Sequence, residues 1–124
     1  MRLQVLLLGL LLSSQAYAVP SIEQAVNDHA AVLTVEERTS ISEKLHTHKA
    51  TTGVQIAVLI VSTTGGVPIE DYAMDVAVKW AGGSDKRDDG ALFVLAIEDR
   101  RMRIEVGYGL EPAIPDAKAA SILA

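Results

Sequence analysis

Two segments of the chain, residues 54–61 and 91–97, are almost continuously apolar and rich in β-branched residues. Such runs are typical of strands that are covered on both faces of a sheet. Between them, apolar residues recur at spacings of three and four, which predicts a helix over 68–81 with one buried face. Pro68 suits the start of this helix. The predicted buried face consists of Ile69, Tyr72, Ala73, Val76 and Trp80.

Two further elements have weaker patterns. Residues 102–107 alternate between polar and apolar positions, as a half-buried strand does, and the polar turn before them predicts a hairpin. Thr34 and Glu37 form a capping-box pattern at the start of a helix over roughly 35–50. The apolar stripe of that helix is thin, so we expect little of it to be buried.

The order of the elements predicts an α/β fold. A strand, a helix and a second strand in succession form a right-handed crossover, so strands 54–61 and 91–97 are expected to be parallel, and the hairpin adds an antiparallel strand. Residues 19–33 fit either a helix or an extended arm, and residues 115–123 are typical of the start of a last helix. We therefore expect a three-layer α/β/α sandwich around a small mixed β-sheet.

Residues 1–18 have the pattern of a secretory signal peptide. Arg2 is followed by a short apolar run over 3–12 and by the small-residue end Ala16-Tyr17-Ala18. Cleavage after Ala18 leaves residues 19–124, a length suited to a single domain. The expected location is the periplasm or the extracellular space, with membrane tethering if the leader is not cleaved.

Composition and charge exclude several functional classes. The 124 residues include no cysteine, which excludes disulfides, thiolate metal sites and a cysteine nucleophile. The formal net charge of −5 provides no basic field that displaces counterions from a nucleic acid, so no nucleic-acid partner is expected. After the leader, no apolar segment reaches the roughly 20 residues that span a bilayer.

Acidic residues gather where the strand over 91–97 begins. Asp85, Asp88 and Asp89 precede it, and the antiparallel strand returns to the same end of the sheet. Carboxylates beside backbone carbonyls suit a hard cation, Ca²⁺ or, as second choice, Mg²⁺. The alternative is a solvated acidic turn. An EF-hand is excluded, because Arg87 and Ala96 stand where that loop needs ligands.

A second candidate site lies at the opposite end of the sheet. The loop over 63–66 precedes a helix, so its backbone N–H groups could hold a phosphate, with Arg100 nearby. An ordinary turn and helix cap is the alternative. His29, His46 and His48 are expected to be structural or on the surface, and no nucleophile-elbow, P-loop or His-Glu-x-x-His pattern occurs.

A series of short motifs runs in order along residues 24–118. They are Val26-Asn27-Asp28-His29-Ala30, Thr52-Gly53-Val54-Gln55, Ile69-Glu70-Asp71-Tyr72-Ala73 with Trp80, Asp88-Asp89-Gly90-Ala91-Leu92, Asp99-Arg100, and residues 103–111. No single motif is specific, but together they resemble the signatures of the TPM domain family. Members of that family have an α/β/α sandwich fold and are typically exported or membrane-tethered.

The resemblance implies an exported cation-binding domain with phosphatase activity, because some members bind Ca²⁺ and some plastid relatives are described as acid phosphatases. We expect Asp88 and Asp89 to bind the cation, with Asp28 brought in by the N-terminal arm; no catalytic residue is assigned. A phosphate-containing ligand and a protein of the envelope or membrane are the other expected partners. The alternative is a non-catalytic binding or assembly module of the cell envelope.

Two departures from the family pattern change these expectations. Asp88-Asp89-Gly90 stands where the family commonly has Asp-Asn-Gly, which adds a negative charge at the expected metal site. The family domain also continues beyond Asp116 through a longer helix and a final segment, whereas this chain ends at Ala124. We therefore expect the last helix and tail to be missing, with apolar sheet surface opposite the helix over 68–81 left partly exposed.

Overall fold

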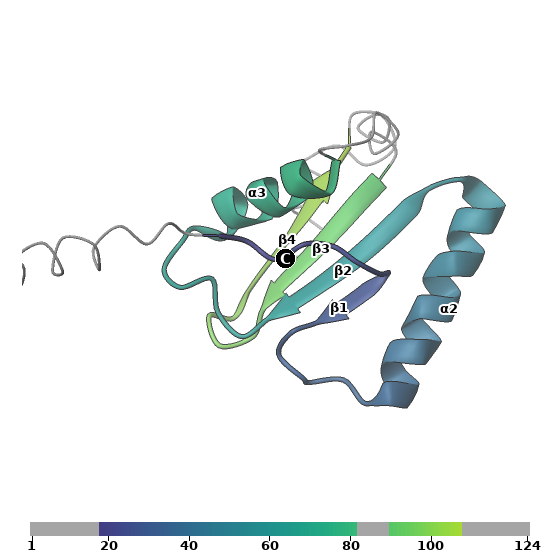
Figure 1. The fold of residues 1–124 in the computed structure, drawn as a ribbon, viewed down its shortest axis with the longest axis horizontal. Coiled ribbons are helices and arrows are strands. Elements are labelled where there is room, and N and C mark those ends of the chain that lie inside the picture. The colour runs from purple at the N-terminus through teal and green to yellow at the C-terminus, as the bar shows by residue number, and fades with distance from the viewer. Residues whose placement is uncertain (1–17, 82–89, 108–124) are drawn as a thin grey trace, which may run out of the picture.

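The computed structural model describes residues 18–81 and 90–107, which form a four-stranded sheet with two helices (Figure 1). The elements are β1 (Val26–Asp28), α2 (Val35–Thr52), β2 (Gln55–Val61), α3 (Ile69–Ala81), β3 (Gly90–Ala96) and β4 (Arg101–Val106). The strands lie in the order β1-β2-β3-β4. β1, β2 and β3 are parallel and β4 is antiparallel to β3, which confirms the predicted α/β fold with a mixed sheet.

The main core lies between α3 and one face of the sheet. Alternate residues of β2 and β3, such as Leu59 and Val94, meet the buried stripe of α3 around Val76, and all three side chains are fully buried. The cluster comprises Ala57, Leu59, Val61, Ile69, Tyr72, Ala73, Val76, Leu92, Val94 and Ala96. Trp80, predicted to belong to this stripe, is half-buried and packs at its border.

The N-terminal segment is extended, and the helical interpretation of residues 19–33 is wrong. β1 pairs in parallel with the second half of β2, with Val26 opposite Val58. The physical reason lies in Asn27, whose buried side chain hydrogen-bonds to backbone groups three and four residues earlier in a turn that competes with a helix. Short edge strands of this kind leave no alternating pattern to detect in a sequence.

Both ends of α2 are fixed by capping interactions, whereas none of its faces is fully buried. The predicted capping box is present: the Glu37 backbone N–H donates to the Thr34 hydroxyl, and the Thr34 N–H donates to the Glu37 carboxylate. Gly53 ends the helix in a left-handed conformation, with its N–H donating to the Lys49 carbonyl at 2.8 Å. No residue of α2 is fully buried; the expected stripe residues Ile41 and Leu45 are half-buried against β1 and β2.

The sheet face opposite α3 is partly exposed. Ile60 and Ile104 are buried there, Phe93 is half-buried, and Met102 at the end of β4 is exposed. The leader, the acidic loop with Asp85, and the last helix predicted over 115–123 lie outside the described residues.

Candidate functional site

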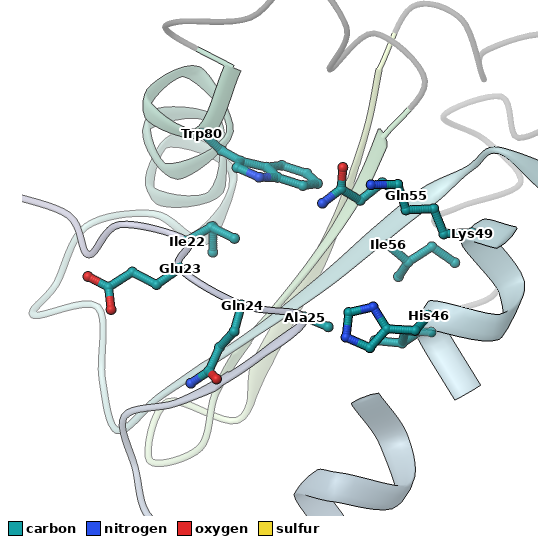
Figure 2. A pocket seen from close by; sticks show the side chains of 10 residues that line it. Ile22, Glu23, Gln24, Ala25, His46, Lys49, Gln55, Ile56 and Trp80 are labelled. Atoms are coloured by element: carbon teal, nitrogen blue, oxygen red, sulfur yellow. The ribbon is translucent and has the colours of Figure 1, made fainter. Parts of the chain in front are cut away.

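A cavity of about 250 Å³ lies beside the first half of β2 (Figure 2). It exists because β1 is shorter than β2: the first β1 residue, Val26, is already opposite Val58, so the residues from Gln55 to Ala57 have no strand on that side. The segment before β1, residues 22–25, and the C-terminal half of α2 form the other walls. The site is therefore a notch at the edge of the sheet, near the end where β2 and β3 begin.

Polar side chains from three elements line this cavity. Lys49 and His46 come from α2, Gln55 from β2 and Trp80 from α3. In Figure 2 the side chains of Lys49 and Gln55 and the indole of Trp80 are directed toward the same side of the cavity. Glu23, the one acidic residue among the described residues of the lining, turns its carboxylate away from these groups. The convergent groups are therefore mainly hydrogen-bond donors, with one positive charge.

The walls of the cavity are held by hydrogen bonds outside it. The Asn27 side chain accepts from the backbone N–H groups of Glu23 and Gln24 at 3.0 and 3.2 Å, and donates to the carbonyls of Gln24 and Val58 at 2.7 and 3.0 Å. The Lys79 ammonium donates to the Val19 carbonyl at 2.9 Å and ties the same segment to α3. These contacts fix one wall of the cavity against the sheet.

The strand register relates this cavity to the expected metal site. Gln55 is paired with Gly90, the first residue of β3. Asp88 and Asp89 immediately precede Gly90 in the chain but lie outside the described residues, so their part in a metal site stays a prediction. Among residues 18–81 and 90–107, no three His, Asp or Glu side chains are grouped so that they could hold a metal ion.

Asp28, expected to join that metal site, lies at the other end of the sheet. It is paired with Ile60, five residues along β2 from Gln55, which corresponds to roughly 17 Å. The Asp28 carboxylate instead accepts hydrogen bonds from the backbone N–H groups of Ala30, Val32 and Leu33 and fixes the turn that leads to α2. Burial raises the pKa of this carboxyl, but the backbone hydrogen bonds outweigh it and the net pKa is lowered.

The anion position predicted in the loop before α3 is taken by the protein's own carboxylate. Asp99 accepts from the Thr64 backbone N–H at 2.9 Å and from the Thr63 hydroxyl at 2.8 Å. These hydrogen bonds, the Thr64 N–H first, and the nearby charge of Arg101 lower the pKa of Asp99. A phosphate would have to displace this carboxylate, so the interpretation of the loop as a turn and cap is the better one, and Arg100 is an exposed residue of the hairpin turn.

The three histidines are exposed, as expected for surface residues. Sequence reasoning missed that His46 and Lys49 border a cavity, because their helix shows no clear polar or apolar face. It also assigned Trp80 to the core alone, although the side chain both packs at the core and lines the cavity. The available signal was Gln55, a polar residue in an otherwise apolar strand at the end where Gly90 lies.

Comparison with known proteins decides the family. The family model for the TPM domain matches residues 26–124. The chain belongs to the TPM domain family. A solution structure of the N-terminal domain of a protein from P. gingivalis is similar to this TPM domain, with a TM-score of 0.75 and 28% identity over 86% of this chain and 75% of that one.

A second solution structure supports the fold of the TPM domain. The N-terminal domain of the cg2496 protein from Corynebacterium glutamicum has a TM-score of 0.59 and 20% identity, over 88% of this chain and 79% of that one. A comparison with curated proteins finds no match. In the part of the TPM domain that the structure describes, no helix is long and apolar enough to cross a membrane.

Proposed function

We propose that this TPM domain binds a divalent cation, Ca²⁺ in preference to Mg²⁺, through Asp88 and Asp89. The observation that supports the proposal is the pairing of Gln55 with Gly90, because Asp89 is bonded to Gly90 in the chain and Gln55 lines the cavity. Carboxylate oxygens are donors of the kind that Ca²⁺ takes. Asp28 has no part in the proposal, because it lies at the other end of the sheet.

Thermal unfolding tests this proposal. A cation that binds only the folded chain stabilises it by about 2.7 kcal/mol at 100 times the Kd, which raises the Tm of a domain of this size by roughly 10 °C or more. We expect Ca²⁺ to raise the Tm relative to a chelator, and the double variant D88N/D89N to lose the increase. The matched control is Asp75→Asn, which removes an exposed carboxylate from the middle of α3. Identical curves with millimolar Ca²⁺ and with chelator would refute cation binding.

A phosphatase activity is the further step that the family resemblance implies. Hydrolysis of a generic phosphomonoester in the presence of Ca²⁺ or Mg²⁺ is the assay, and an activity lost in Asp89→Asn but kept in Asp75→Asn would support it. Ca²⁺ binding without hydrolysis would favour the second candidate, a non-catalytic binding or assembly module of the cell envelope.

Export is part of the same proposal. It is supported by the signal-peptide pattern of residues 1–18. Expression of the full chain in a bacterial host, followed by N-terminal sequencing of the periplasmic fraction, is expected to find Val19 as the first residue. Recovery of the chain only in the cytoplasm with Met1 intact would contradict it.

A further inference from the structure

We propose that the cavity beside β2 binds an oxyanion, a phosphate or carboxylate group of a small ligand, with the Lys49 ammonium as the anchoring charge. This site goes beyond the cation proposal, because it uses no acidic residue and does not require a bound metal. His46, Gln55 and Trp80 also line the cavity.

The charge of the cavity is the first argument. The chain as a whole carries a net charge of −5, yet among the residues that the structure describes, the side chains directed into this cavity include a cation and no carboxylate, since Glu23 is directed away. Lys49 forms no ion pair with any residue that the structure describes, and the one ion pair found there joins Arg103 to Glu105 on β4. An ammonium without a carboxylate at a cavity is a local attraction for an external anion.

The second argument is the shape and lining of the site. Leu45, Ile22 and Ile56 supply apolar surface among the polar groups. Such surface lowers the local dielectric constant and strengthens the attraction between an ammonium and an anion. A volume of about 250 Å³ is large enough to hold several water molecules. An oxyanion therefore fits together with part of the molecule that carries it.

The backbone of β2 adds directionality. Val58 and Ile60 direct their backbone groups toward β1, as shown by the bonds from Val58 N–H to the Ala25 carbonyl and from His29 N–H to the Ile60 carbonyl. Because this direction alternates along a strand, Ile56 points its backbone N–H and C=O to the same side, before β1 has begun and where the cavity lies. The Ile56 N–H therefore supplies one donor of fixed direction for an oxyanion, whereas the Ile56 carbonyl is an acceptor and suits a donor group of the ligand.

An apolar ligand fits the lining less well. A purely apolar ligand would strip water from the exposed Lys49 ammonium and from the His46 imidazole without replacing their hydrogen bonds. An oxyanion satisfies the same groups with charge-assisted hydrogen bonds.

The single tryptophan makes the site directly observable, because Trp80 lines it and no other tryptophan contributes to the fluorescence. The full chain is titrated with inorganic phosphate and, separately, with acetate, in the presence of a chelator and with chloride adjusted to constant ionic strength. We expect a saturable change for at least one oxyanion and none for chloride. Calorimetric titration of the same samples detects binding that leaves the fluorescence unchanged.

A matched pair of variants assigns the binding to the cavity. Lys49→Gln removes the anchoring charge and is expected to weaken oxyanion binding tenfold or more. Lys44→Gln makes the same charge change on the same helix, but five residues away, which is about 140° around the axis and on another face; it is expected to bind like the wild type. Both positions are exposed, so neither variant is expected to disturb the fold.

Two results would overturn the proposal: no saturable binding of either oxyanion by fluorescence and calorimetry, or equal weakening in both variants, which would indicate a general charge effect. The ratio of phosphate to acetate affinity identifies the preferred headgroup. D88N/D89N separates this proposal from the cation proposal. If this variant keeps oxyanion binding and loses Ca²⁺ binding, both the oxyanion proposal and the cation proposal are supported. If the wild-type chain binds an oxyanion through Lys49 but never binds Ca²⁺, the cation proposal is refuted and the oxyanion proposal stands.

Discussion

Removal of the Asn27 side chain is expected to destabilise the domain far more than its size suggests. The side chain is 4% exposed and makes four hydrogen bonds, two as acceptor and two as donor. A typical intramolecular hydrogen bond contributes about 0.5–1.5 kcal/mol net, and a buried group left without its partner costs about 1–3 kcal/mol. Glu23 and Gln24 are exposed, so water replaces their lost bonds, while the Val58 carbonyl is half-buried and is satisfied less well.

We therefore expect Asn27→Ala to lower the free energy of unfolding by about 2–4 kcal/mol, a large fraction of the roughly 5–15 kcal/mol of an ordinary domain. Urea unfolding followed by circular dichroism measures the loss. Asn27→Asp separates the two halves of the network, because it keeps the acceptor but turns an oxygen toward the carbonyls of Gln24 and Val58. It is expected to be no more stable than Asn27→Ala at neutral pH.

The control for this prediction is Gln24→Ala, which removes an exposed side chain and leaves the backbone bonds to Asn27 in place. Its free energy of unfolding is expected to stay within about 0.5 kcal/mol of the wild type. The reasoning is refuted if Asn27→Ala also stays within that range, or if Gln24→Ala costs as much as Asn27→Ala.

Three further variants test the core, the turn before α3 and the end of α2. Leu59→Ala, at a fully buried position, should lower the free energy of unfolding in urea by about 2–5 kcal/mol. Its control, Met74→Ala at 50% exposure, should lower it by under about 1 kcal/mol. Equal losses would contradict the assigned core. Because the pKa of Asp99 is lowered in the folded state, its ionised carboxylate stabilises the fold above the ordinary value of 3.8, and this stabilisation is lost as the pH falls through the folded-state pKa. Asp99→Asn should therefore flatten the decrease in the free energy of unfolding below about pH 4. An unchanged decrease at acidic pH would count against the Asp99 contacts. Gly53→Ala should cost about 1 kcal/mol from its φ of 77° alone, since a Cβ there meets nothing within 4 Å; a neutral effect would show that the helix end relaxes freely.

The central part of this fold could be predicted from the sequence because burial imposes a repeat on it. The apolar residues around Val76 recur on one face of α3, and the run around Leu59 in β2 is apolar throughout. These patterns predict a helix and a buried strand, and their order along the chain predicts the parallel pairing. The predicted caps of α2 at Thr34 and Gly53 are also confirmed, because each depends on a few adjacent residues. Local rules work where the interaction itself is local.

The parts that failed depend on contacts between distant residues. Asn27 meets the Val58 carbonyl, 31 residues away in the chain, and no periodicity in residues 19–33 reports that bond. The loop at Thr64 was predicted as a phosphate site, but the Thr64 backbone N–H binds the carboxylate of Asp99, 35 residues later in the chain. Asp28 was assigned to the wrong end of the sheet because β1 itself was not predicted, and only the strand register fixes its position.

The construction of α2 has a dynamic consequence. Its ends are fixed by a capping box and a left-handed glycine, but none of its 18 residues is fully buried, so little apolar surface opposes its separation from the sheet. Local opening of such an element costs less free energy than global unfolding, and the amides of α2 are expected to exchange with solvent faster than those of β2 and β3. Because α2 carries Lys49, opening of α2 would take the anchoring charge away from the cavity. A bound anion would therefore either dissociate or keep α2 in place. Occupancy of a small site at the sheet edge thereby sets how often a whole helix opens.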